Sequence, residues 1–205
     1  MNSEFTTYQA QTTPHPLALE IARANGSYVY DTSGKAYLDF IAGVSACSLG
    51  HQHPAVKKAI AAQLDKYLHV MVYGEFVQET PLALCKLLAH HLPEGLETTY
   101  LVNSGTEAID GAIKLARRAT GRSEIIAALG AYHGNSYGAL SLMSNQERIA
   151  PFRPGIGDVS FIPFNCERYC SFVELCTPYI YTINGSQCFL KMLLKNFKNI
   201  FKKWL

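Results

Sequence analysis

The sequence predicts an α/β fold in which helices cover a mostly parallel β-sheet. Apolar residues recur every three to four positions in 54–68 and 80–91, which is the period of amphipathic helices. Short apolar runs at 98–103, 124–129 and 159–164 are typical of buried strands, and a third helical pattern separates the first two. Strands that alternate with helices are the pattern of a layered α/β sheet.

The composition fits one sizeable packed domain without a strongly charged partner. The chain has 205 residues, of which 48% are hydrophobic, and its formal net charge is +2. This charge gives no indication of a nucleic-acid partner. No apolar run approaches about 18 residues, and the first residues lack a basic cluster followed by an apolar core. We therefore expect no membrane partner and a cytoplasmic protein, whose six cysteines are reduced thiols.

The N-terminal part is expected to contain a β-hairpin followed by two helices. Residues 27–43 alternate apolar and polar side chains on either side of a Thr-Ser-Gly turn signal at 32–34. Pro54 suits the first position of the next helix, because that position has no N–H bond to lose. Thr80 is expected to cap the helix after it.

A strand that turns directly into a helix at Ser104, Gly105 and Thr106 is the most informative local feature. Ser104 or Thr106 is expected to cap helix 105–120, and Gly121 to end it. The first turn of a helix presents unpaired N–H groups and a positive dipole end, and glycine lets an anion approach the backbone. The pattern therefore suits a phosphate group. An ordinary N-cap with a tight turn explains the same tripeptide, so both interpretations stay open.

Longer motifs around this tripeptide resemble the class III aminotransferases. They are NSGTEAIDGAIKLARRATGRSEII, AYHGNSYGALSLM and, upstream, YVYDTSGKAYLDFIAGVSACSLGHQHPAVKKAI, all within about Tyr8 to Asn165. The resemblance implies a fold type I architecture that binds pyridoxal 5'-phosphate. Residues 1–50 would form an N-terminal segment with the hairpin, and residues 51–165 the start of the large cofactor-binding domain. It also implies transfer of an amino group from a small-molecule amino donor to a 2-oxo acid or aldehyde, in a homodimer.

The resemblance implies that five residues contact or flank the cofactor: Ser104, Gly105, Thr106, Tyr132 and His133. The first three would hold its phosphate, the tyrosine would stack on the pyridine ring, and the histidine would shape the turn beside that ring. Asn135 stands where acetylornithine-type members carry an arginine that grips a substrate carboxylate. Because asparagine cannot form a bidentate charged pair, this departure argues against an acetylornithine substrate.

The residues that the resemblance requires for catalysis are not identified in this chain. Members of the family use a lysine that forms a Schiff base with the cofactor and a carboxylate that pairs with the pyridinium nitrogen. No lysine occurs between Lys114 and Lys191. We therefore predict that the Schiff-base lysine is absent and that this chain is inactive by itself. The alternative is a non-catalytic remnant that binds phosphate weakly.

Residues 166–205 differ in composition from the rest of the chain. They contain six of the 18 basic residues, two of the 16 acidic residues and no alanine. The pattern from Leu190 to Trp204 is that of a basic amphipathic helix, which suits a membrane surface or a partner groove. The other interpretation, which we prefer, is a non-family tail that follows truncation or a frameshift near residue 165.

No metal site is predicted. The pairs His51/His53 and His90/His91 have no carboxylate or cysteine cluster around them at the spacing of metal ligands. The sequence also contains no P-loop and no complete dinucleotide-binding fingerprint.

Overall fold

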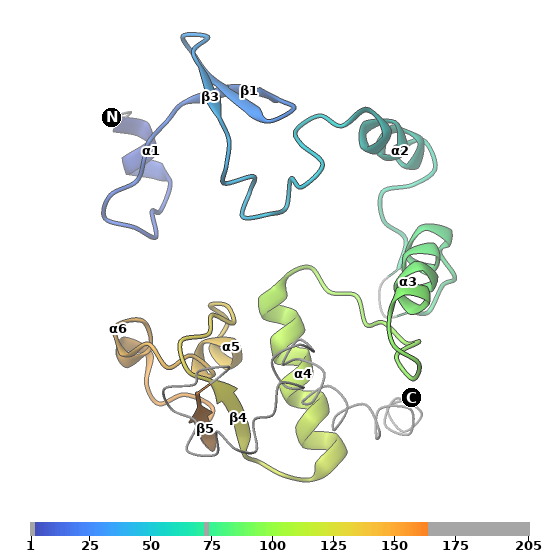
Figure 1. The fold of residues 1–205 in the computed structure, drawn as a ribbon, viewed down its shortest axis with the longest axis vertical. Helices are drawn as coiled ribbons and strands as arrows, with labels where there is room; N and C mark the ends of the chain where they lie inside the picture. Colours follow the sequence, from blue (N-terminus) through green and yellow to red (C-terminus); the bar gives the residue numbers. More distant parts are fainter. Residues whose placement is uncertain (1–2, 72–73, 164–205) are drawn as a thin grey trace, which may run out of the picture. The chain divides into compact units, whose positions relative to one another are not determined.

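The computed structural model describes residues 3–71 and 74–163 (Figure 1). The chain divides into two compact units, Met1–Phe76 and Val77–Leu205, and each is described by itself. The predicted amphipathic helix near the C-terminus and the segment 166–205 lie outside the described residues. Among the described helices, none combines the length and the apolar character that crossing a membrane requires.

The first unit contains a small antiparallel sheet, with one helix before it and one after it in the sequence. Its elements are α1 (Ser3–Tyr8), β1 (Ile21–Asn25), β2 (Tyr28–Asp31), β3 (Ala36–Leu38) and α2 (Pro54–Leu64). The strand order is β1-β2-β3, and both neighbouring pairs are antiparallel. The predicted hairpin is confirmed as β2 and β3, and the sheet gains β1 as a third strand. The helix predicted from Pro54 is also confirmed, and Pro54 is its first residue.

The turn between β2 and β3 is organised by one carboxylate. Asp31 Oδ1 accepts hydrogen bonds from Ser33 N at 2.9 Å and from Lys35 N at 3.0 Å, and Tyr37 Oη donates to Asp31 Oδ2 at 2.9 Å. The Ser33 hydroxyl also donates to this carboxylate and is the largest cause that lowers the pKa of Asp31, followed by Tyr37. An aspartate that accepts bonds from the backbone two residues on is a common way to fix a tight turn.

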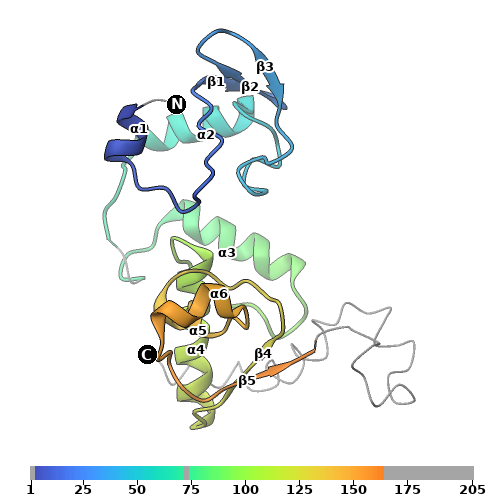
Figure 2. The ribbon, with the colours of Figure 1, turned by 90° about the vertical axis from the view of Figure 1, so that its left-hand side faces the viewer.

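The second unit contains a helix and strand arrangement of the α/β kind. Its elements are α3 (Glu79–His91), α4 (Gly105–Thr120), β4 (Ile125–Ala128), α5 (Tyr137–Ser141), α6 (Gln146–Ile149), the 3-10 helix η1 (Ala150–Phe152) and β5 (Val159–Ile162). The strands β4 and β5 are parallel, with Ile125 opposite Val159. Both views show α5 beside α4, which it contacts (Figures 1 and 2). The predicted strands at 124–129 and 159–164 are thereby confirmed.

Helix α4 ends where its sequence predicts and packs into the core of the second unit. Its C-cap is Gly121, whose φ of 69° is the left-handed conformation that ends many helices. Ile113 is buried from the inner face of the helix and packs with Ala127 and Leu142. This cluster fixes α4 against β4 and against the segment that follows α5, so the start of α4 is held in a defined place.

Two local predictions are wrong. Residues 98–103 form no strand, because no described segment provides the hydrogen-bonded neighbour that a strand needs. Helix α3 has Gln78 rather than Thr80 at its N-cap position and begins two residues earlier than a cap at Thr80 predicts. The apolar stripes of α2 and α3 are present, but Ile60 is 55% exposed and Leu87 56% exposed. Periodicity predicted these two helices correctly, whereas it could not show what covers them.

Candidate functional site

At the N-terminus of α4, side chains cap some of the backbone N–H groups and leave others without an acceptor among the described residues. Ser104 is the N-cap residue, and its Oγ accepts from Glu107 N at 3.3 Å. Glu107 Oε2 in turn accepts from Asn103 N at 2.8 Å, so the side chains at both ends of the turn cap it. The N–H groups of Gly105 and Thr106 have no acceptor among the described residues. Two backbone donors and the positive end of the helix dipole therefore point out of the helix.

The segment that follows β4 approaches this helix start closely. Ser136 N donates to Thr106 Oγ1 at 3.0 Å, and the two hydroxyl oxygens lie 2.5 Å apart. Gly134 is buried with a φ of +127°, and a Cβ at this position would lie 3.0 Å from Thr106 Cα and closer still to its side chain. Only glycine allows this approach. The predicted phosphate-binding tripeptide and the predicted Tyr-His-Gly turn are thus brought together.

The remaining predicted residues lie on this turn in different environments. Tyr132 is 65% exposed, and the guanidinium carbon of Arg148 lies 5.5 Å from the centre of its ring. Its ring therefore has exposed area on which a planar group can stack. His133 Nε2 is buried without a hydrogen-bond partner among the described residues. Asn135, the residue that departs from the acetylornithine-type pattern, is exposed.

A second close approach lies one turn further along α4. Asp110 Oδ1 is buried without a hydrogen-bond partner among the described residues. A Cβ at Gly138 would overlap this oxygen and would lie 3.4 Å from Ile113 Cδ1. Glycine at the start of α5 thus lets the two helices approach each other, and this contact holds the turn before α5 at the N-terminus of α4.

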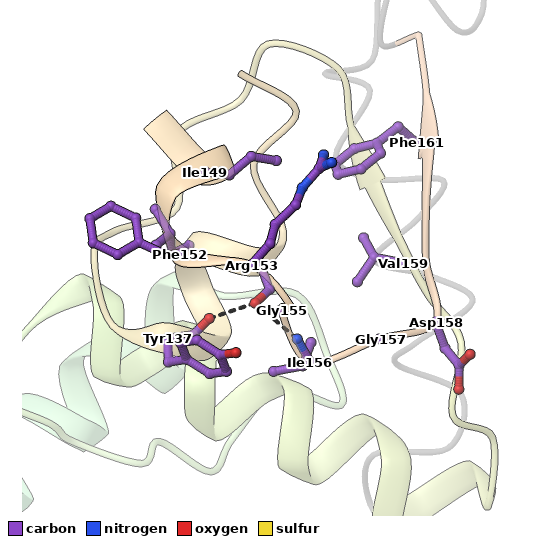
Figure 3. A pocket seen from close by; sticks show the side chains of 12 residues that line it. Tyr137, Ile149, Phe152, Arg153, Gly155, Ile156, Gly157, Asp158, Val159 and Phe161 are labelled. Atoms are coloured by element: carbon purple, nitrogen blue, oxygen red, sulfur yellow. Dashed lines mark hydrogen bonds between the residues drawn. The ribbon is translucent and has the colours of Figure 1, made fainter. Parts of the chain in front are cut away.

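A cavity of about 240 Å³ lies on the other side of α5 (Figure 3). Most of its lining is apolar or aromatic, from Tyr137, Ile149, Phe152, Ile156, Val159 and Phe161. Ser141 Oγ donates to Tyr137 O at 2.6 Å and accepts from Ile156 N at 3.1 Å beside it. The cavity is lined by none of the five predicted site residues. We therefore place the candidate site at the start of α4, where unpaired donors converge, rather than in this cavity.

Of the histidine pairs considered as metal ligands, His51/His53 lies in the first unit and His90/His91 at the end of α3 in the second. His51 Nε2 is 2.7 Å from Asp39 Oδ2, and Gly26 pairs with His51 through two backbone hydrogen bonds. The hydrogen bond with His51 is the largest cause that lowers the pKa of Asp39, followed by the bond from Ala42 N. His51 therefore links the segment before α2 to the small sheet through hydrogen bonds. Within residues 3–71 and 74–163, no three His, Cys, Asp or Glu side chains form a group that could hold a metal ion.

Sequence reasoning named the two segments of the candidate site but missed the contacts between them. It named Ser104, Gly105 and Thr106 on one segment and Tyr132 and His133 on the other. It did not identify Ser136, which bonds to Thr106, or the contact of Asp110 with Gly138. The sequence did contain a signal for these contacts. Positions 134, 136 and 138 are glycine, serine and glycine, and such small residues permit close packing against a helix.

Comparisons with known proteins agree with the motifs. The profile of the family described as aminotransferase class-III matches residues 8–191. The chain is 40% identical over 148 residues to the acetylornithine aminotransferase of Bacillus amyloliquefaciens, which covers 72% of this chain and 62% of that protein. It is 35% identical over 147 residues to the LysW-aminoadipate semialdehyde/glutamate semialdehyde transaminase of Sulfolobus acidocaldarius. That match covers 72% of this chain and 38% of that protein.

A solved structure shows the same fold. The ornithine aminotransferase of Toxoplasma gondii, with pyridoxal phosphate at partial occupancy in its active site, matches with a TM-score of 0.68 and 25% identity. The match covers 78% of this chain and 38% of that chain. The chain spans between 35 and 62% of the length of the curated relatives that it matches. The predicted α/β fold class and the predicted resemblance are both confirmed, and this chain belongs to the class-III aminotransferase family.

Proposed function

We propose that this chain takes part in the transfer of an amino group from an amino donor to a 2-oxo acid or aldehyde with pyridoxal 5'-phosphate. The chain described here would supply the part that holds the cofactor's phosphate and one face of its ring. The observation that supports this most directly is the meeting of Thr106, at the start of α4, with the turn that carries Tyr132 and His133. The family membership supplies the reaction class.

The donors at the start of α4 fit a phosphate group. The N–H groups of Gly105 and Thr106 are unpaired among the described residues, and the Thr106 hydroxyl lies beside them. A Cβ at Gly105 would meet no atom within 4 Å, so space is open above the backbone. A doubly charged phosphate accepts strong hydrogen bonds and is further stabilised by the helix dipole.

Each of the five site residues has a defined role in this proposal. When bound, pyridoxal phosphate supplies an electron sink for the amino-bearing carbon of the substrate. Ser104, Gly105 and Thr106 would fix the phosphate, and Tyr132 would fix the plane of the ring through its exposed face. His133 would keep the turn in place, with its buried Nε2 available to a partner outside the described residues. We assign no proton-transfer residue among the described residues.

The substrate carboxylate is proposed not to bind at position 135. Asn135 offers a neutral amide where a guanidinium would be needed for a bidentate pair. We therefore expect a donor other than acetylornithine, although two named relatives act on acetylornithine and on LysW-bound semialdehydes. A homodimer and a cytoplasmic location are further proposals that rest on the resemblance and the composition.

Equilibrium dialysis of the full chain tests the proposed cofactor site. Pyridoxal 5'-phosphate should bind at least about tenfold more tightly than pyridoxal, because only the former carries the charged group that the helix start would hold. Thr106→Val should remove most of this difference, whereas Thr98→Val, outside the site, should not. Equal binding of the two compounds by the unaltered chain would refute the proposed site.

A second candidate is a non-catalytic chain that binds phosphate weakly. It is favoured by the absence of lysine between Lys114 and Lys191 in the sequence. Borohydride treatment with pyridoxal phosphate, followed by peptide mass spectrometry, separates the two. A single lysine modified in stoichiometric amount supports the enzyme, and scattered substoichiometric modification supports the weak binder. The boundary that we predict near residue 165 is part of this alternative, and the family profile continues to residue 191.

A further inference from the structure

Ser136 makes an unusual set of hydrogen bonds for its position. It is the N-cap residue of α5, where a serine hydroxyl ordinarily accepts from the first turn of the helix, yet it makes no such bond. Its hydroxyl instead lies 2.5 Å from Thr106 Oγ1, and its N–H donates to the same Thr106 oxygen at 3.0 Å. The side chain thus bonds to α4 instead of capping its own helix.

The hydroxyl protons can be placed by counting acceptors. The Ser136 hydroxyl has two acceptors within reach, Thr106 Oγ1 at 2.5 Å and Thr106 O at 3.5 Å. Bonds from one oxygen to another are typically about 2.5–3.0 Å long, so the second contact is too long to compete. Either oxygen of the short pair can donate, and when Thr106 Oγ1 donates to a bound anion, the Ser136 proton must lie between the two hydroxyl oxygens. Thr106 Oγ1 then accepts from both the N–H and the O–H of Ser136.

This arrangement determines what the Thr106 hydroxyl can do next. A hydroxyl has two acceptor lone pairs and one proton, so after accepting twice it can only donate. Threonine in a helix often donates to the carbonyl four residues before it, but Thr106 lies in the first turn, and no such bond is present there. The Gly134 backbone, packed on the Thr106 side chain, holds the hydroxyl in this orientation.

We propose that Ser136 is a positioning residue that directs the Thr106 hydroxyl to donate toward a phosphate monoester dianion. The proposal rests on the proposed function, because it concerns the same phosphate site. A hydroxyl that cannot accept has nothing to offer a donor ligand such as an ammonium group. A dianion, by contrast, gains a donor whose direction is set before the ligand arrives.

The proposal predicts an effect that passes through Thr106. In equilibrium dialysis at about pH 8, Ser136→Ala should weaken pyridoxal 5'-phosphate binding about three- to tenfold, because the donor loses its fixed orientation but not its proton. Binding of pyridoxal, which lacks the phosphate, should not change. Ser136→Thr, which keeps a hydroxyl, should restore most of the affinity. Ser144→Ala is the matched control, because it removes a serine Oγ that is also hydrogen-bonded, as the acceptor from Gly130 N at 2.8 Å, but that does not touch Thr106.

A double-mutant comparison makes the test decisive even if one variant folds poorly. In a Thr106→Val background, Ser136→Ala should cause no further loss of phosphate-dependent binding. An equal loss in both backgrounds, or an equal loss for pyridoxal, would show that Ser136 acts only on the fold and would overturn the proposal. So would an unchanged affinity of Ser136→Ala. If the unaltered chain itself shows no preference for the phosphorylated compound, the proposed function fails together with this inference.

Discussion

Replacing Gly134 by alanine is the sharpest test of the close approach between the turn and α4. Gly134 has a φ of +127°, a region that residues with a side chain rarely adopt. An added Cβ would lie 3.0 Å from Thr106 Cα, a backbone atom that cannot move aside without shifting the first turn of the helix. The substitution therefore introduces both backbone strain and a steric overlap.

The two effects can be estimated separately. Holding a non-glycine residue in such a conformation costs about 1–3 kcal/mol. Forcing an extra methyl group into a packed contact costs about 1–3 kcal/mol as well. We therefore expect Gly134→Ala to lower the free energy of unfolding by about 3 kcal/mol, which corresponds to a loss of about 6–12 °C in the melting temperature of a chain of 205 residues.

Gly130→Ala is the matched control for this prediction. Gly130 has a φ of +73°, but a Cβ there would meet no atom within 4 Å. It should therefore show only the conformational cost, about 1 kcal/mol. Urea unfolding of the full chain, followed by far-ultraviolet circular dichroism, measures both variants. A loss in Gly134→Ala no larger than that in Gly130→Ala would refute the close approach described here.

Three further substitutions test other contacts. The pKa of Asp39 is lowered in the folded chain, chiefly by its hydrogen bond to the facing imidazole, so its stabilisation is present above about pH 3.8 and is lost as the pH falls through the folded value. Urea titrations at several pH values should show less acid-induced loss of stability in Asp39→Asn, and an unchanged pH dependence would contradict this. Gly138→Ala should destabilise the chain by about 1–3 kcal/mol because its Cβ would overlap the Asp110 carboxylate, and Asp110→Ala should restore most of that loss. Simple additivity of these two changes in urea unfolding would argue against the overlap. Arg117 donates to two backbone carbonyl oxygens at 2.9 and 3.3 Å, so Arg117→Ala should lower stability by about 1–2 kcal/mol, and an equal loss for Arg118→Ala would contradict the specific role.

Helix α4 shows why part of the fold could be predicted. Its beginning and end follow from residues adjacent in sequence, with a serine at the N-cap and a glycine in the left-handed conformation at the C-cap. Its buried face follows from the period of its apolar residues, which places Ile113 in the core. The parallel partners β4 and β5 were also predictable, since each is an apolar run of strand length.

Residues 98–103 show where such reasoning fails. Their composition is that of a strand, but a strand exists only when a neighbour pairs with its backbone, and no described segment does so. The apolar stripes of α2 and α3 fail in a different way. Their helical period is correct, whereas their burial depends on what packs against them, and residues such as Ile60 and Leu87 stay exposed.

The sequence by itself determined the family, the α/β class and the residue types at the proposed phosphate site, because these depend on long motifs and on local helix chemistry. Only the tertiary structure decided that Ser136 bonds to Thr106, 30 positions away, rather than capping its own helix. That choice depends on the packing of α5 against α4, where Gly134 and Gly138 leave no room for a side chain. A hydroxyl forms a hydrogen bond with whichever partner the packing brings within bonding distance, and that distance cannot be predicted from the neighbouring residues in the sequence.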